Sequence, residues 1–102
     1  MEEIICEAIR ARKTLQFNYR GGGCTVEPYC LGTNNKGDLI LLGYQCSGHA
    51  LLGTTGQGAN WVPFPVDRLS DLKLTELNFV SRPKSNLKEI IVEIICCTDD
   101  WI

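Results

Sequence analysis

Three consecutive glycines, Gly21 to Gly23, follow Arg20 and are candidates for a phosphate-binding loop. A glycine-rich loop binds phosphate when a strand leads into a pattern such as GxxxxGK followed by Ser or Thr, and a helix then presents its N-terminus to the anion. Here the glycines lead into Cys24, Thr25 and Val26, which have the character of a strand, and neither Lys-Ser nor Lys-Thr follows. The sequence therefore predicts that the glycines turn a hairpin, a role that suits residues without a Cβ.

Cys46 and His49 have the spacing Cys-x-x-His, which occurs in zinc sites and could also serve a nucleophilic cysteine. A structural zinc ion needs four ligands, and the chain has no second pair at a suitable spacing. A catalytic cysteine also needs a third group to orient its histidine, and the neighbouring sequence supplies none. We therefore expect no metal, no cofactor and no catalytic residue, and we predict that the protein is not an enzyme.

Arg68 is the first candidate for ligand binding, because a guanidinium group offers fork-like donors to a phosphate or a carboxylate. The alternative is an ion pair with Asp67, Asp71 or Glu27 that holds the last strand of the domain in place. The sequence leaves both alternatives open.

Three aromatic residues, Tyr44, Trp61 and Phe64, could form a stacking surface, since each ring offers a π-face to a base. In a small β-domain such rings more often fill the core. The core is the favoured position for Phe64, whereas Tyr44 and Trp61 are amphipathic rings beside a loop and fit either position.

The composition gives no overall positive field, because ten basic and twelve acidic residues leave a formal net charge of -2. Nucleic-acid binding would then depend on a local patch. The best candidate consists of Arg10, Arg12, Lys13 and Arg20. The favoured alternative is that these cations neutralise the C-terminal end of a helix.

At 102 residues the chain is long enough for one domain and too short for two. No apolar run approaches the roughly 20 residues that span a bilayer, and the first residues, MEEI, lack the basic and apolar regions of a secretory signal. We therefore expect a cytoplasmic protein without membrane contact. The six cysteines contain no Cys-x-x-Cys pair, so buried, reduced thiols are expected.

The hydrophobic pattern predicts the elements that position these residues. Ile5, Ala8 and Ile9 recur at helical spacing, which predicts a helix over residues 2–13. From Thr14 the period changes to two, which predicts one strand before the glycines and a second strand after them. Pro28 in the second strand indicates an edge or a bend, because proline cannot donate to a sheet ladder.

The remainder of the chain alternates between extended segments and turns or loops. The sequence predicts a turn at 33–37, a central strand at 39–42, a loop at 45–60 with a short strand at 49–52, and strands at 61–65 and 72–77. In the tail, Asn86 and Glu89 resemble a helix-capping box, but the β-branched residues that follow favour a strand beginning near Glu89.

Five stretches that follow the helix resemble, in their order, the WYL-domain family: FNYRGG, VEPYCLG, GDLILLGYQ, NWVPFPVDRLSDLKLT and NFVSRP. The resemblance covers residues 5–83, and five weak motifs in the right order are more specific than one. It implies a small Sm-like β-barrel of the Src-homology-3 type, with five strands, preceded by a helix. In most members this domain follows a winged-helix DNA-binding domain in bacterial transcription regulators. There it is thought to sense a ligand, often single-stranded nucleic acid or a nucleotide.

The resemblance also points to particular residues. Tyr44 and Gln45 match the residues after the family's Trp-Tyr-Leu triplet, and Arg68 falls in the family's Asp-Arg-Ile motif. The triplet itself aligns with residues 39–41, of which only the leucine is kept. Two arginines that the family carries nearby are replaced here by other residues. This chain looks like the short, stand-alone variety, because no DNA-binding domain precedes it.

The combined prediction is a non-enzymatic, ligand-sensing module that binds a nucleotide, single-stranded nucleic acid or another small anion. The alternative is an accessory protein that forms homo-oligomers or modulates a partner regulator. The chain is expected to form one mainly β domain, with the helix in residues 1–13, the barrel in 14–77 and a C-terminal extension in 78–102. The expected ligand-binding residues are Arg68, Tyr44, Trp61, Arg20 and Gln45.

Overall fold

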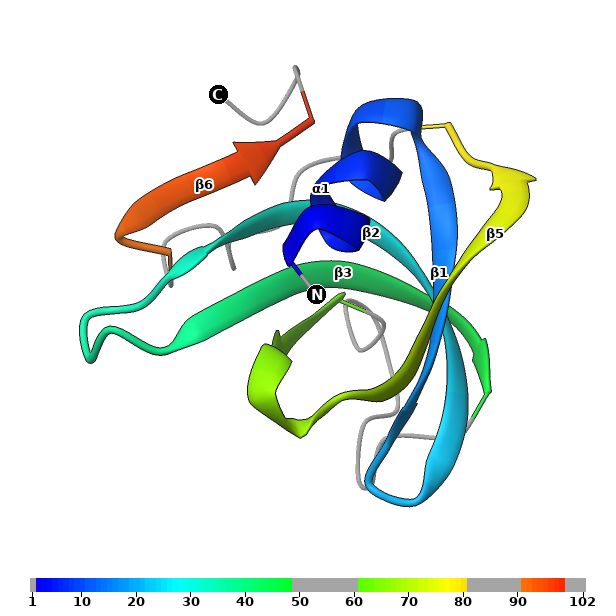
Figure 1. Cartoon of the computed structure of the whole chain (residues 1–102), viewed down its shortest axis with the longest axis horizontal. Helices are drawn as coiled ribbons and strands as arrows, with labels where there is room; N and C mark the ends of the chain where they lie inside the picture. Colours follow the sequence, from blue (N-terminus) through cyan, green and yellow to red (C-terminus); the bar gives the residue numbers. More distant parts are fainter. Residues whose placement is uncertain (1, 49–60, 81–90, 99–102) are drawn as a thin grey trace.

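The computed structural model of the protein describes residues 2–48, 61–80 and 91–98. Within them, one helix precedes the strands of an antiparallel sheet, so the chain is mainly β with an N-terminal helix, as predicted. Figure 1 shows the helix lying over one face of the sheet. The elements in chain order are α1 (Glu2–Ala11), β1 (Lys13–Tyr19), β2 (Gly22–Thr33), β3 (Leu39–Gly48), β4 (Trp61–Pro65), the 3-10 turn η1 (Val66–Arg68), β5 (Ser70–Asn78) and β6 (Glu93–Cys97).

The helix α1 forms because one of its sides is apolar. Ile5, Ala8 and Ile9 are buried against the sheet, as their spacing predicts. The helix ends slightly earlier than predicted, before Arg12, whose φ of 53° lies in the left-handed region that commonly terminates helices. The side-chain amide of Asn78 donates to carbonyl oxygens at this end, which ties the helix to the end of β5.

Arg20 and Gly21 form a two-residue hairpin turn between β1 and β2. Their φ values are 54° and 80°, and Tyr19 pairs with Gly22 across the turn. Two consecutive positive φ values are the signature of the tight hairpin turn whose twist matches the flanking strands. The predicted hairpin at the glycines is confirmed, and a strand stands where a phosphate-binding loop would have a helix.

The middle strand of the sheet is β2, in the order β4-β3-β2-β1-β5. Its 12 residues pair with β1 and β6 along two halves of one edge and with β3 along the other edge. The prediction that residues 39–42 form the central strand is therefore wrong, since they belong to β3. Pro28 lies in the middle strand and not at an edge, but the predicted bend is present as a register shift between Pro28 and Cys30.

The sheet is open. β4 and β5 are its two ends, and within the described residues no pairing joins them. The turn η1 connects the two strands. Closure into the predicted five-stranded barrel is therefore not confirmed.

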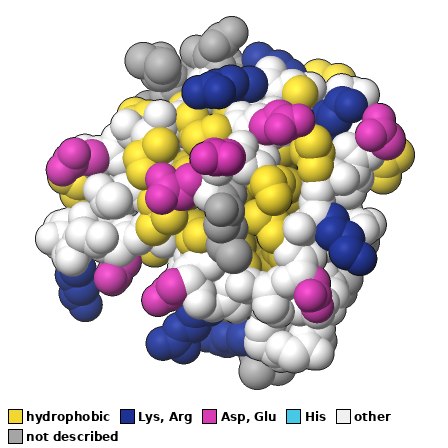
Figure 2. Space-filling model, in the orientation of Figure 1, with side chains coloured by type: hydrophobic (Ala, Val, Ile, Leu, Met, Phe, Trp, Pro, Cys, Tyr) yellow, Lys and Arg dark blue, Asp and Glu magenta, His cyan; other side chains and the backbone are white. Residues whose placement is uncertain are grey.

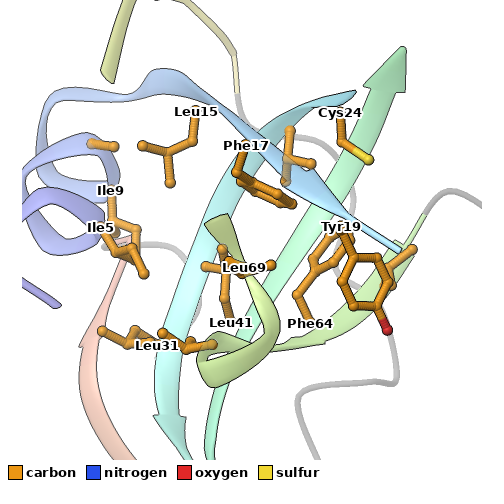
Figure 3. Packing of buried hydrophobic residues seen from close by; sticks show 14 of the residues in the cluster. Ile5, Ile9, Leu15, Phe17, Tyr19, Cys24, Leu31, Leu41, Phe64 and Leu69 are labelled. Carbon is orange, nitrogen blue, oxygen red and sulfur yellow. The ribbon is translucent and has the colours of Figure 1, made fainter. Parts of the chain in front are cut away.

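The larger hydrophobic cluster, here called the inner cluster, lies between α1 and the sheet. Figure 3 shows Phe17, Tyr19 and Phe64 within it. The ring of Phe64 meets those of Phe17 and Tyr19 edge to face, with centroids 5.1 and 5.4 Å away. Phe64 has no exposed surface, so its predicted core position is confirmed.

A second cluster, the outer cluster, covers the opposite face of the sheet. Its buried members are Tyr29, Cys30, Ile40, Leu42 and Phe79, and Tyr44, Trp61, Ile91 and Cys97 pack against it with part of their surface exposed. The alternation of side chains along β3 and β4 distributes neighbouring residues between the two clusters. The sheet thus contributes apolar side chains on both of its faces.

The turn between β2 and β3 is organised by Asn34. Its Oδ1 accepts hydrogen bonds from the backbone N–H groups of Lys36 and Asp38, at 3.0 and 2.9 Å, and Gly37 has a φ of 82°. This arrangement confirms the turn predicted at 33–37.

β3 continues to Gly48, so the first residues of the loop predicted at 45–60 belong to a strand. The short strand predicted at 49–52 lies outside the described residues. The strands predicted at 61–65 and 72–77 are confirmed as β4 and β5. Across the described parts of the chain, no helix is both long enough and apolar enough to cross a membrane.

The strand predicted in the tail is present as β6, although it begins later than Glu89. It pairs with the second half of β2. Residues 81–90, which contain the capping-box pattern, lie outside the described residues.

Two disulfides attach β6 to the rest of the domain. Cys6 is bonded to Cys96, and Cys30 is bonded to Cys97. The prediction of reduced thiols is therefore wrong for four of the six cysteines. Because the partners are 90 and 67 residues apart, their pairing follows from the fold and not from spacing along the chain.

Candidate ligand-binding surface

Two predicted site residues, Tyr44 on β3 and Trp61 on β4, lie opposite one another in the sheet. Their ring centroids are 5.4 Å apart and the rings meet edge to face. Both side chains are half-buried in the outer cluster. The pair therefore presents part of two aromatic rings at the surface while the remainder packs against the sheet.

Two further rings, which the sequence pattern does not single out, extend this pair into a row. Tyr29 lies 4.9 Å from Trp61 and 5.1 Å from Phe79, measured between ring centroids. Tyr29 is completely buried, so it supports the exposed pair from below. We call Tyr44, Trp61, Tyr29 and Phe79 the aromatic row.

A buried carboxylate lies beside the aromatic row. Glu27 is 5% exposed, and its Oε1 accepts a hydrogen bond of 2.9 Å from the hydroxyl of Tyr29. Its Oε2 accepts from the thiol of Cys46 at 3.3 Å. Glu27 and Tyr29 are two residues apart on one strand, so alternation could have placed them on one face, but the contact with Cys46 depends on the β2–β3 register.

Gln45 lies on the other face of the sheet from Tyr44, because consecutive strand residues point in opposite directions. It is 8% exposed, and its Nε2 donates to the sulfur of Cys24 at 3.7 Å. Cys24 belongs to the inner cluster. The structure therefore does not bring Gln45 together with Tyr44 and Trp61.

Arg20 occupies the exposed turn between β1 and β2. Its guanidinium carbon lies 5.4 Å from the centroid of the Tyr19 ring, which is a cation–π contact. Tyr19 in turn packs on Phe64 in the inner cluster. Arg20 is thus held at the end of the hairpin, on the side of the sheet opposite to the aromatic row.

Arg68 ends the turn η1 and is exposed. Among the described residues it forms no ion pair, so the alternative of a bond to Asp67, Asp71 or Glu27 is not realised. The carboxylate of Asp71 accepts instead from the side-chain amide of Asn18 at 2.8 Å. The exposed guanidinium of Arg68 is therefore a candidate donor to an anionic ligand.

Arg68 and the aromatic pair lie toward opposite ends of β4. The strand begins at Trp61 and contains five residues, so its ends are roughly 13 Å apart at the usual rise of a strand. Arg68 follows its far end. A ligand that contacts both must be extended, whereas a small anion can contact Arg68 alone.

Cys46 is exposed, and its S–H group donates to Glu27. His49, the other member of the Cys-x-x-His pair, lies outside the described residues. Within the parts of the chain that are described, no group of three or more His, Cys, Asp or Glu residues could hold a metal ion.

The four bases between Arg10 and Arg20 do not form one patch. Lys13 pairs with Glu76 at 3.3 Å, and the length of β1 separates Lys13 from Arg20 by roughly 20 Å. Figure 2 shows the described Lys and Arg side chains spread along the rim of the face that carries α1. This distribution favours the alternative that Arg10 neutralises the C-terminal end of α1.

Two hollows contain none of the five predicted site residues. One, of about 270 Å³, lies over β1, β2 and β5 and is lined by polar side chains that include Asn18, Asp71 and Lys73. The other, of about 600 Å³, is a groove along α1 that is lined by Glu3, Cys6 and Glu7 among others. Neither of these two hollows therefore coincides with the predicted site.

Comparison of this chain with protein-family models, with curated proteins and with solved structures gave no match.

Proposed function

We propose that this protein is a non-enzymatic, ligand-sensing module of the WYL type. Its ligand would be single-stranded nucleic acid, a nucleotide or another small anion, and its context would be bacterial transcription regulation. Two features support the proposal. The first is a helix followed by the strand order β4-β3-β2-β1-β5, which suits an Sm-like barrel that is incompletely closed. The second is the order of the sequence motifs.

The observation that carries the proposal is the exposed guanidinium of Arg68, which has no carboxylate partner among the described residues. An arginine that holds a strand in place would be paired, whereas one that receives a ligand keeps its donors available. Bidentate pairing with a phosphate gives such a residue both affinity and orientation.

Tyr44 and Trp61 supply a second contact, which does not depend on the base sequence of the ligand. The exposed parts of their rings can stack on a base, as in proteins that bind single strands. Because the pair and Arg68 lie toward opposite ends of β4, the arrangement favours an oligonucleotide of a few residues over a mononucleotide.

A non-enzymatic role is supported by the state of the exposed cysteine. The S–H group of Cys46 donates a hydrogen bond to Glu27, and a cysteine that donates in this way is present as the thiol. The nucleophile in cysteine catalysis is the thiolate.

A titration tests the proposal. Labelled single-stranded DNA and RNA and a series of nucleotides are titrated at low salt into the wild type, Arg68→Ala and Lys36→Ala. Lys36→Ala is the matched control, because Lys36 is exposed in the β2–β3 turn and its substitution also removes one positive charge. Loss of a charge-assisted hydrogen bond is expected to weaken binding by about tenfold for Arg68→Ala, and Lys36→Ala should stay within about twofold. Binding that is absent, or equal in the wild type and Arg68→Ala, would count against the proposal.

Exposed apolar residues in and beside β6 favour one second candidate, an accessory protein that oligomerises. Val92, Ile94 and Ile95 expose much of their surface, and within the described residues β6 pairs only with β2. An apolar strand edge of this kind can pair with a second copy. Light scattering over a range of concentrations distinguishes the two candidates. A strict monomer excludes the oligomerising accessory protein, whereas a dimer that the Ile94→Lys substitution dissociates supports it.

A further inference from the structure

Consecutive cysteines attach the two faces of β6 to two different elements. Cys96 points into the inner cluster and is bonded to Cys6 of α1. Cys97 packs on the outer cluster and is bonded to Cys30 of β2. Alternation along a strand makes this possible, since neighbouring residues face opposite sides. A single short strand therefore carries both disulfides of the described structure.

Apart from its sulfur atoms, β6 has weak anchors. Val92, Ile94 and Ile95 are 62%, 55% and 45% exposed. The strand pairs with β2 at four positions with one register shift, and the backbone N–H groups of Val92 and Thr98 extend this pairing by one bond at each end. Thr98, which follows the strand, is buried, but its hydroxyl has no hydrogen-bond partner in the described structure, and such a group opposes burial.

A groove on the outside of α1 includes one disulfide cysteine, Cys6, in its lining. The groove of about 600 Å³ is lined by Glu2, Glu3, Cys6, Glu7, Arg10 and Ala11. Figure 2 shows acidic side chains lying among hydrophobic ones over the region of α1. A small thiol that enters the groove meets Cys6, which is 8% exposed and is bonded to the equally buried Cys96.

We propose that the attachment of β6 is redox-controlled: dithiol reductants open the Cys6–Cys96 and Cys30–Cys97 disulfides, and β6 then leaves the sheet while the remaining strands stay folded. The remaining elements keep the inner cluster, which is formed by α1, β1, β2, β3, β4, η1 and Leu69 and takes only Cys96 from β6. This proposal concerns β6 and does not depend on ligand binding at Arg68.

The chemistry balances with a dithiol as the named reductant. A thiolate of the reductant attacks one sulfur of the protein disulfide, the S–S bond breaks, and the released cysteine thiolate takes up a proton. The second thiol of the reductant then displaces the second cysteine and forms a new disulfide within the reductant. Each protein disulfide gains two electrons and two protons, and the dithiol loses the same number.

The opened state differs from the closed state in two ways. The edge of β2 from Cys30 to Thr33, which β6 covers in the closed state, becomes free to pair. The side of α1 at Cys6 loses its covalent bond to the tail. Disulfides persist in oxidising compartments and are reduced in the cytosol, so the compartment determines which state is populated.

Hydrogen exchange with mass-spectrometric detection tests the proposal on the full chain, with and without dithiothreitol. A peptide map without reductant should show the two cysteine pairs. After reduction, exchange in residues 93–97 is expected to accelerate at least tenfold, while exchange in β1 and β3 stays within about twofold.

Two variants serve as controls. In Cys46→Ser, which leaves both disulfides intact, β6 should respond to reductant as in the wild type. In the double variant Cys96→Ala/Cys97→Ala, β6 should exchange rapidly without reductant and should not respond to it. If that variant fails to fold, the wild-type comparison still decides.

Three results would overturn the proposal. The first is a peptide map that shows six free thiols without reductant. The second is a β6 that stays protected from hydrogen exchange after complete reduction. The third is loss of this protection throughout the domain on reduction. The last result would mean that the disulfides hold the whole fold and not one strand.

Discussion

The hydroxyl of Tyr29 donates a hydrogen bond of 2.9 Å to the buried carboxylate of Glu27. Both side chains are almost completely removed from solvent, so water cannot easily replace either partner. Tyr29→Phe keeps the ring contacts with Trp61 and Phe79 but removes the donor. We expect this variant to lower the free energy of unfolding by about 1–3 kcal/mol, the usual cost of an unsatisfied buried group, in chemical denaturation.

Tyr19→Phe is the matched control for Tyr29→Phe. Tyr19 also packs in a cluster, but the described structure shows no hydrogen bond from its hydroxyl. Its loss should change the free energy of unfolding by less than about 0.5 kcal/mol. Equal effects of the two variants would show that the bond to Glu27 contributes nothing specific.

Phe64 should be among the most sensitive residues of the core. It is fully buried, and its ring lies between those of Phe17 and Tyr19. Phe64→Ala is expected to lower the free energy of unfolding by about 3–5 kcal/mol, because it removes apolar contacts and leaves a cavity. Val80→Ala, at a position that is 87% exposed, should stay within about 0.5 kcal/mol of the wild type. Urea titrations of both variants measure the difference.

Gly32 is required where β2 and β6 approach each other. A Cβ at this position would collide with the carbonyl oxygen of Glu93 and with the side chain of Ile91. We expect Gly32→Ala to disturb the pairing of β6 and to lower the free energy of unfolding by about 1–3 kcal/mol, as overpacking does. The same substitution at Gly23 meets only Asn18 Oδ1 at 3.6 Å and should be nearly neutral. Thermal denaturation measures the stability of both variants. If Gly23→Ala proves less stable than Gly32→Ala, the β2–β6 contact is described incorrectly.

Arg20 is suboptimal for its own turn. Its φ of 54° is unfavourable for a residue with a long side chain, whereas asparagine followed by glycine is preferred in this type of hairpin. Arg20→Asn should therefore raise the free energy of unfolding by about 0.5 kcal/mol, even after loss of the cation–π contact with Tyr19. A lower stability in urea titration would mean that this contact outweighs the turn preference.

Local pattern predicted the elements of this fold well. Leu15, Phe17 and Tyr19 alternate along the sequence and are all buried on one face of β1. The hairpin expected at the glycines is present, with Gly21 in its turn and Gly22 and Gly23 already in β2. In each case the controlling interaction lies within a few residues of the signal.

Features that depend on distant segments were not predictable in this way. The run of apolar residues from Leu39 resembled a central strand, but β2 takes that place because its length allows it to pair with three strands. The disulfide partners of Cys96 and Cys97 lie in α1 and β2. No spacing along the chain encodes these pairings.

The candidate site could be predicted only in part, because its contacts also depend on segments that are distant in the sequence. The sequence predicts both Tyr44 and Trp61 as site residues. Their contact follows from the β3–β4 register, which the sequence does not reveal. Gln45 follows Tyr44 directly, and strand alternation separates the two. Glu27 was considered only as an ion-pair partner of Arg68, and its bonds to Tyr29 and Cys46 required the three-dimensional arrangement.

The most direct test of the central claim is an NMR titration of the ¹⁵N-labelled protein with a short single-stranded oligonucleotide at low salt. We expect the largest shift changes at the Trp61 indole, at Tyr44 and at Val66–Arg68, with the changes at all three lost or much reduced in Arg68→Ala. Shift changes confined to the groove on α1 or to the hollow over β1, β2 and β5, or no changes at millimolar oligonucleotide, would contradict it.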